Sequence, residues 1–270
     1  MTKTKTKRQL RGRNFQDALS AFRDMGIPFE VVRTGYTATV ILSDGRRFLF
    51  SEGKEGPNVK LFSTFQLLRK SIKEAGIPPM PERINYYHLD KLRKCSTLPQ
   101  EAWCYDLTAA YPHALYHMGL IDETMLRRLM SLPKAERLRV VGMLATKKTH
   151  IHYDGQEVVD NYTSENDTAP AFFAVCHQVG DLMMELVDHP SFLFFWVDGA
   201  YFDKRHPEVI DHFAACGYPC KEEVITDLKW SATKRYLFYR KESERKYLCL
   251  PQERKPAPQW ICEKLSERRD

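Results

Sequence analysis

Apolar and polar residues alternate along the first third of the chain in patterns that predict a set of strands between two helices. The spacing of Phe15, Ala18, Leu19 and Phe22 predicts a helix that ends near Gly26. Three strand-like runs and a second helix follow, at residues 29–33, 37–42, 46–50 and 63–75. We therefore expect a small α+β accessory domain over residues 14–83, which ends in a proline-rich linker at 77–83.

From residue 84 the pattern changes to longer helical stripes between aromatic strands. We expect a strand ending at Asp106, a helix at 109–118 and a long helix at 171–187. The other expected elements are a helix at 122–130, strands at 137–146 and 149–153, a polar connection at 161–167, strands at 192–198 and 224–230, a helix at 207–216, and a hairpin at 234–239 and 246–250. This irregular alternation favours an α+β fold over a doubly wound sheet. The second domain is expected over 84–250, followed by a C-terminal tail at 251–270.

The formal net charge of +6 is mild, but its distribution is uneven. Residues 1–13 carry six basic residues and no acidic one, namely Lys3, Lys5, Lys7, Arg8, Arg11 and Arg13. Such a segment is either a solvated, disordered tail or an arm that contacts nucleic-acid phosphates, and the two roles are compatible because such arms order on binding.

Cysteine usage and hydropathy indicate the compartment. The seven cysteines include no C-x-x-C pair and no paired framework, which suits a reducing environment. Cys216 and Cys220 lie four positions apart, but no second ligand pair follows, so no zinc site is expected there. No secretory signal and no apolar run of membrane-spanning length is present. The sequence predicts a cytoplasmic protein without a membrane partner.

Two aspartates lie at positions that suit metal binding. Asp106 follows the apolar run Trp103-Cys104-Tyr105, and Asp198 interrupts an aromatic strand. A carboxylate in such a setting is costly to bury unless something neutralises its charge. If the fold brings both together they repel each other, and divalent cations relieve that repulsion while activating an oxygen for attack on phosphorus.

The segment that begins at Asp106 resembles the first motif of the palm domain of family B DNA polymerases, particularly the compact protein-primed phage and plasmid type. That motif reads Asp-x-x-Ser-Leu-Tyr-Pro, and the chain matches its Asp, Tyr and Pro while carrying Ala-Ala in place of Ser-Leu. The resemblance implies that Asp106 binds metal together with the Leu107 carbonyl. It also implies that Thr108, Ala109, Ala110 and Tyr111 contact the incoming triphosphate, with Tyr111 under the sugar.

Two further segments resemble later motifs of the same family. Trp196-Val197-Asp198-Gly199 aligns with Asp-Thr-Asp-Gly, so Asp198 takes the place of the principal metal ligand and Trp196 replaces the first aspartate. The helix before it resembles the one that precedes this motif in the family. The segment from Thr233 to Tyr236 resembles the Lys-x-Tyr motif that holds the primer, which implies primer contacts for Lys234, Arg235 and Tyr236.

The resemblance implies an antiparallel palm sheet backed by helices and a metal-dependent nucleotidyltransferase. Such an enzyme would add deoxynucleotides to a 3′-hydroxyl in DNA replication, with two Mg2+ or Mn2+ ions as cofactors. Its partners would be a DNA primer-template, deoxynucleoside triphosphates and a replication protein, in a host cell that carries a phage or mobile element. The fingers motif and the proofreading exonuclease signature of the family are absent from the sequence.

Three other interpretations stay open. A degenerate palm could bind nucleic acid or a replication partner without catalysis, as Trp196 and the absent fingers suggest. A rolling-circle nickase of the His-hydrophobe-His kind is suggested by His150-Ile151-His152, which places two imidazoles on one face of a strand, with Tyr87 as a candidate nucleophile. The order of elements in residues 14–83 also occurs in double-stranded-RNA-binding domains.

Overall fold

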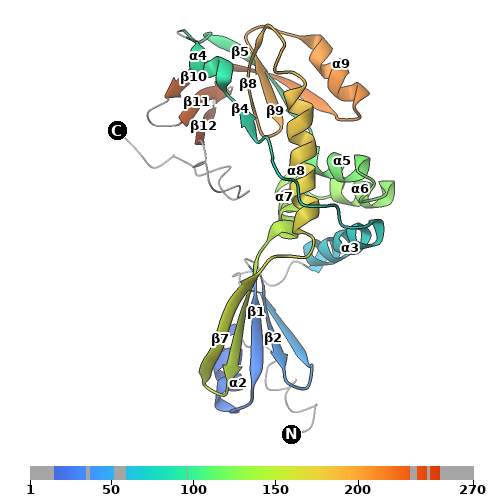
Figure 1. The fold of residues 1–270 in the computed structure, drawn as a ribbon, viewed down its shortest axis with the longest axis vertical. Helices are drawn as coiled ribbons and strands as arrows, with labels where there is room; N and C mark the ends of the chain where they lie inside the picture. Colours follow the sequence, from blue (N-terminus) through green and yellow to red (C-terminus); the bar gives the residue numbers. More distant parts are fainter. Residues whose placement is uncertain are drawn as a thin grey trace. The chain divides into compact units, whose positions relative to one another are not determined.

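The computed structural model describes residues 15–34, 37–51, 59–95, 97–231, 236–241 and 244–249. These residues form an α+β protein with two antiparallel sheets (Figure 1). The chain divides into two compact units, which we call unit 1 and unit 2. Unit 1 comprises Met1–Lys70 and Lys134–Ala169, and unit 2 comprises Ser71–Pro133 and Pro170–Asp270.

Unit 1 contains a five-stranded sheet of order β3-β2-β1-β6-β7. Its elements are α2 (Phe15–Asp24), β1 (Phe29–Arg33), β2 (Thr37–Leu42), β3 (Arg47–Ser51), most of α3 (Val59–Ala75), α7 (Lys134–Gly142), the 3-10 turn η1 (Met143–Ala145), β6 (Lys148–Asp154) and β7 (Glu157–Ser164). The alternating burial of β2 places Ala38, Val40 and Leu42 inward, where they pack with Phe22 of α2. Burial of this apolar face is the main stabilising contribution to the sheet.

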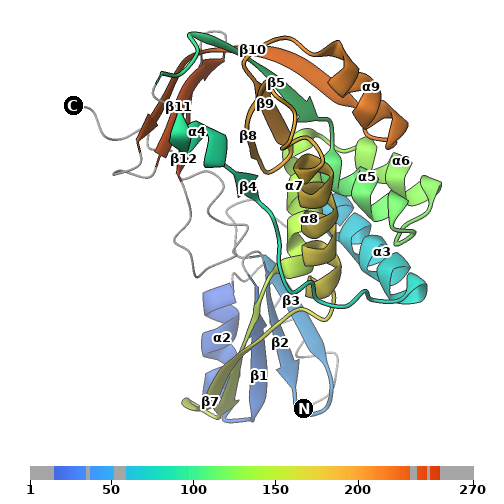
Figure 2. The same cartoon turned by 45° about the horizontal axis from the view of Figure 1, so that its top comes forward.

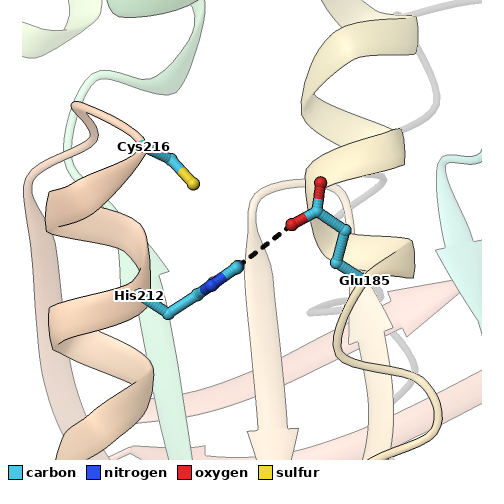
Figure 3. A group of neighbouring side chains, drawn as sticks. All are labelled: Glu185, His212 and Cys216. Atoms are coloured by element: carbon cyan, nitrogen blue, oxygen red, sulfur yellow. Dashed lines mark ion pairs between the residues drawn. The ribbon is translucent and has the colours of Figure 1, made fainter.

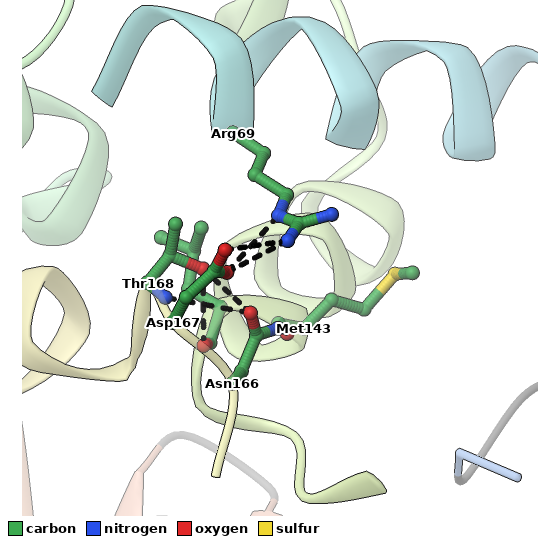
Figure 4. A network of polar contacts seen from close by, with 6 residues as sticks. Arg69, Met143, Asn166, Asp167 and Thr168 are labelled. Carbon is green, nitrogen blue, oxygen red and sulfur yellow. Dashed lines mark hydrogen bonds and ion pairs between the residues drawn. The ribbon is translucent and has the colours of Figure 1, made fainter. Parts of the chain in front are cut away.

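A polar network ties three segments of unit 1 together (Figure 4). The Arg69 guanidinium donates to both carboxylate oxygens of Asp167, at 2.8 and 2.7 Å. Next to this pair, the buried Asn166 side chain donates to the Met143 carbonyl at 3.1 Å, and Thr168 contacts the Leu144 carbonyl. These bonds add side-chain donors to the carbonyls of Met143 and Leu144 in η1, and the Met143 carbonyl also accepts the Thr146 N–H.

Two sequence predictions in this region are wrong. The segment predicted as a strand at 137–146 is helical, because Pro133 is followed by the strong helix formers Lys-Ala-Glu-Arg, and α7 buries Val140 and Val141. The polar connection predicted at 161–167 is in large part β7, an exposed edge strand that pairs with β6 across the Gly155-Gln156 turn.

The division of the chain also differs from the boundary predicted at residue 83. The β6–β7 hairpin joins the sheet of the N-terminal residues, because β6 pairs with β1 from Phe29↔Tyr153 to Arg33↔Thr149. Tyr153 stacks on Phe29 with ring centroids 4.6 Å apart, so the hairpin completes the core of unit 1. Unit 1 is therefore built from two separate stretches of sequence.

Unit 2 contains a seven-stranded sheet of order β12-β11-β10-β5-β9-β8-β4. Its elements are β4 (Tyr87–His88), α4 (Asp90–Lys94), β5 (Glu101–Leu107), α5 (Ala110–His117), α6 (Glu123–Met130), most of α8 (Ala169–Met184), β8 (Phe192–Trp196), β9 (Gly199–Phe202), α9 (Pro207–Ala215), β10 (Cys220–Ser231), β11 (Tyr236–Lys241) and β12 (Glu244–Cys249). From β5 to β10 the main elements follow the order of a split β-α-β motif, with the antiparallel strand order β10-β5-β9-β8.

The sheet of unit 2 is apolar on both faces. On one face Tyr105 packs edge-on against Phe202 at 5.5 Å, and α9 packs on β5 and β10 (Figure 2). On the other face Phe194 stacks on Tyr201 at 4.1 Å, within a cluster that includes Leu89 and Leu92. Since side chains alternate along a strand, Asp106 shares the second face with Cys104.

No helix among the described residues is both long enough and apolar enough to span a bilayer.

Candidate active site

Asp106 lies near the end of β5, between two strands of the sheet. Its partner in β9 is Gly199, and its partner in β10 is Lys221. A Cβ atom added to Gly199 would stand 3.5 Å from Oδ1 of Asp106. A side chain at Gly199 would therefore contact both this half-buried carboxylate and the Tyr201 ring.

Asp198 lies in the two-residue turn between β8 and β9. Trp196 pairs with Gly199, so Val197 and Asp198 are the central residues of the turn. The Leu107 N–H donates to the Asp198 carbonyl at 2.9 Å, which fixes the turn against the end of β5. The fold thus brings the backbones of two aspartates that are 92 positions apart (198 − 106) to adjacent sites in the sheet.

The two carboxylates have different neighbours. Asp106 raises the pKa of the buried Cys104 thiol, after the larger effect of burial itself. Burial raises the pKa of Tyr111 well above its ordinary value, and the charges of Cys176 and then Asp198 raise it further. The Tyr111 phenol is therefore protonated at neutral pH, beside Asp198 and with its ring 6.0 Å from that of Phe172.

Backbone strain accompanies both aspartates. Among the described residues, the non-glycine residues with positive φ are Ala109, Val197 and Asp227. Val197, at φ 57°, immediately precedes Asp198, and Ala109, at φ 55°, is three residues after Asp106. The left-handed region is costly for a β-branched residue such as valine. Strain of this kind is frequent at functional sites, where the surrounding structure holds it in place.

The start of α5 differs in part from what the resemblance implies. The Thr108 N–H donates to the Pro219 carbonyl at 2.7 Å, so this amide already has a protein acceptor. Ala109 is the N-cap of α5, and Ala110 and Tyr111 are its first two residues. Their N–H groups are in the first helical turn, which has no intrahelical acceptors. These two amides are the better candidates for binding an anion.

Charged residues on β10 were not identified from the sequence as part of the site. Lys221 is exposed and lies directly beside Asp106 in the β5–β10 pairing, while Glu223 pairs with Cys104 two residues further along and forms an ion pair with Lys241. The signal that could have revealed them is the Lys-Glu-Glu run at the start of β10. Leu107, the other expected ligand, ends β5 opposite Cys220.

The remaining predicted contacts are only partly described. Lys234, Arg235 and the six basic residues of the N-terminal segment lie outside the described residues. The backbone of Tyr236 begins β11 and pairs with Ser231 of β10 and Cys249 of β12. This places the start of β11 two strands away from Asp106 in the sheet order β11-β10-β5.

The two histidines of the nickase interpretation do share one face of β6. His150 stacks on Tyr162 with ring centroids 4.6 Å apart. Its Nδ1 is 2.6 Å from a carboxylate oxygen of Glu30, and its Nε2 is 2.8 Å from the Ser164 hydroxyl. Because both ring nitrogens of His150 already have protein partners, a metal ion would have to displace one of them. Tyr87 is in unit 2, whereas both histidines are in unit 1.

Clusters of three or more side chains that could hold a metal ion occur elsewhere in the described residues. They are Glu185 with His212 and Cys216, and His189 with His206 and Glu208. Asp106 and Asp198 belong to neither cluster, and a Mg2+ site built on them would need further oxygen ligands, such as water or a phosphate. Comparison with models of known protein families, with curated proteins and with solved structures finds no match to this chain.

Proposed function

We propose that unit 2 is a minimal palm-like nucleotidyltransferase that adds deoxynucleotides to a 3′-hydroxyl with the help of two Mg2+ or Mn2+ ions. The observation that carries the proposal is the pairing of Asp106 with Gly199, the residue that directly follows Asp198 in the β8–β9 turn. A metal-binding carboxylate at the end of one strand and another in the adjacent hairpin turn is the arrangement that the motif resemblance implies.

In this proposal each group has a role. Asp106 and Asp198 would hold the cations, one of which lowers the pKa of the attacking 3′-hydroxyl while the other neutralises the leaving pyrophosphate. The amides of Ala110 and Tyr111 would bind a phosphate at the start of α5. Lys221, exposed beside Asp106, is positioned to supply a cationic contact to the triphosphate or to a DNA strand.

The proposal is tested by nucleotide incorporation on primed and unprimed DNA with all four deoxynucleotides and Mg2+ or Mn2+. Asp106→Asn and Asp198→Asn should each lower incorporation by about 10³-fold or more, because each removes a metal ligand. The matched control is Asp211→Asn, which changes an exposed carboxylate on α9 and should retain activity. Wild-type activity in either of the first two variants would refute the assignment.

One observation favours a second candidate, a palm that binds nucleic acid without catalysis. Trp196, at the position of the family's first aspartate, is buried and stacks on Tyr87 with ring centroids 5.5 Å apart. It is part of the core and cannot supply a ligand. If wild-type protein binds DNA but incorporates no nucleotide with either metal, this second function is favoured.

A further inference from the structure

A second candidate metal centre lies between the C-terminal ends of α8 and α9, away from the two aspartates. Glu185 directly follows the last residue of α8, and His212 and Cys216 lie one turn apart at the end of α9. Figure 3 shows the three side chains pointing toward one another across the space between the two helices. One carboxylate oxygen, one imidazole nitrogen and one sulfur all lie within 4.8 Å of one another.

The distances suit a small tetrahedral ion. Nε2 of His212 is 3.2 Å from Oε2 of Glu185. Two N or O ligands of a zinc ion, at roughly 2.0–2.1 Å from the metal, stand about 3.3 Å apart in tetrahedral geometry. The nitrogen and the oxygen therefore already have the spacing that such an ion requires. The Cys216 sulfur lies within 4.8 Å of both atoms.

The local field favours a cation at this point. Each helix carries a partial negative charge at its C-terminus, and both α8 and α9 end here. Gly217, at φ +82°, takes the left-handed conformation that ends α9 and leaves Cys216 as its C-cap. The helix ends and the Glu185 carboxylate thus all favour positive charge.

The site also opens onto a pocket. Glu185 and Cys216 line a pocket of about 620 Å³, together with His177, Asp181 and Tyr218. His177 and Asp181 on α8 are four residues apart and form an ion pair at 3.3 Å, and Glu185 follows four residues later, just beyond the helix. Three protein ligands that leave one position open toward a pocket are characteristic of catalytic zinc sites, whereas structural zinc sites have four.

We propose that Glu185, His212 and Cys216 bind one zinc-class divalent ion, with a fourth coordination position open to this pocket. The mixed oxygen, nitrogen and sulfur ligands select zinc or cobalt over magnesium, which prefers oxygen alone. The ion would join α8 to α9 and could polarise a water molecule or a small anionic ligand in the pocket. This site is independent of the proposed Mg2+ or Mn2+ site at Asp106 and Asp198.

The test is titration of the metal-free full-length chain with Co2+, followed by optical spectroscopy and displacement by Zn2+. The expected result is one Co2+ per chain, with a thiolate-to-cobalt charge-transfer band. Cys216→Ser should remove this band, and His212→Ala and Glu185→Gln should weaken binding by about 100-fold, since loss of even an outer-shell partner costs about 10–100-fold. Circular dichroism establishes that the variants fold.

Two controls separate this site from others. Cys95→Ser removes another exposed cysteine and should leave the band unchanged, and Asp106→Asn should bind Co2+ as the wild type does. Absence of a thiolate band in the wild type would overturn the proposal. An unchanged band in Cys216→Ser, or its loss in Cys95→Ser, would also overturn it.

Discussion

Replacement of Gly180 by alanine should destabilise unit 2, although alanine is the better helix former. Gly180 is inside α8, and a Cβ atom added there would stand 2.3 Å from the Asn85 carbonyl oxygen and 3.1 Å from its carbon. Ordinary contacts between such atoms are about 3.5 Å, so the overlap is about 1 Å. The opposing atoms are backbone, which cannot rotate away, and one of the two segments must move.

The magnitude follows from two opposing effects. Alanine gains about 1 kcal/mol over glycine from helix propensity. Overpacking of a well-packed contact costs about 1–3 kcal/mol, and an overlap with backbone belongs at the upper end of that range. The net loss in the free energy of unfolding should be about 1–2 kcal/mol, which corresponds to a fall in Tm of roughly 2–8 °C for a chain of this size.

Gly142→Ala is the matched control for this prediction. Gly142 ends α7 with helical φ, and no atom lies within 4 Å of an added Cβ. This variant should therefore keep or raise the Tm. Thermal and urea unfolding followed by circular dichroism compares the two variants. If Gly180→Ala proves as stable as Gly142→Ala, α8 does not pass Asn85 at the distance described.

Three other predictions concern charge and thiol chemistry. Burial, followed by the charge of His206, lowers the pKa of His189, whose Nδ1 accepts the Ser191 N–H at 3.2 Å. The unfolded chain therefore protonates His189 more readily than the folded chain, and the free energy of unfolding should fall as the pH drops below about 6.5. His189→Asn should flatten this fall in urea unfolding between about pH 8 and pH 5, and an equal slope in both proteins would contradict the assignment. Arg69→Lys keeps the positive charge but loses the two-pronged hydrogen bonding to Asp167. Because the pair is partly exposed, the free energy of unfolding in urea should fall by at most about 1 kcal/mol. A fall above about 2 kcal/mol would show that the network of Figure 4 depends on the Arg69 guanidinium. Maleimide should label the exposed Cys95 and Cys216 before Cys176, since burial raises the pKa of Cys176 to about 12. Zn2+ should protect Cys216 but not Cys95 from labelling. Faster labelling of Cys176 than of the exposed cysteines would refute the described packing.

The hairpin that bears Asp198 shows where sequence patterns succeed and where they fail. The Asp-Gly pair predicts a turn, and a turn is present. Its centre is nevertheless Val197-Asp198 rather than Asp198-Gly199. Turn rules place glycine at the position with positive φ, but Val197 takes that position here. Gly199 instead begins β9, where an added Cβ would contact the Asp106 carboxylate at 3.5 Å.

Strand pairing between distant segments was the least predictable feature. Strands β1 and β2 follow from their alternating apolar residues, and their bounds agree with the prediction. The pairing of β6 with β1 depends on contacts such as Tyr153 with Phe29, which no local pattern encodes. Edge strand β7 is exposed along almost its whole length, so it lacks the apolar alternation that reveals a strand.

The candidate site was predictable to a similar degree. Asp106 and Asp198 stand out because each follows apolar residues, and the fold places their backbones side by side. Lys221 was missed because its position depends on the register of β10 against β5. The proposed second metal site was missed because Glu185 follows α8, 27 positions before His212 on α9 (212 − 185). Local spacing along the chain reveals only the pair on α9.

In the proposed active site Asp106 and Asp198 bind the same divalent ion in the presence of a triphosphate. Electron paramagnetic resonance of Mn2+ titrated into the protein with a deoxynucleoside triphosphate measures this directly. Asp106→Asn and Asp198→Asn should each weaken binding of that ion, and the double variant should lose little more than either single one, because residues that share one ligand are not additive. Wild-type Mn2+ affinity in both single variants, or fully additive losses in the double variant, would contradict the account.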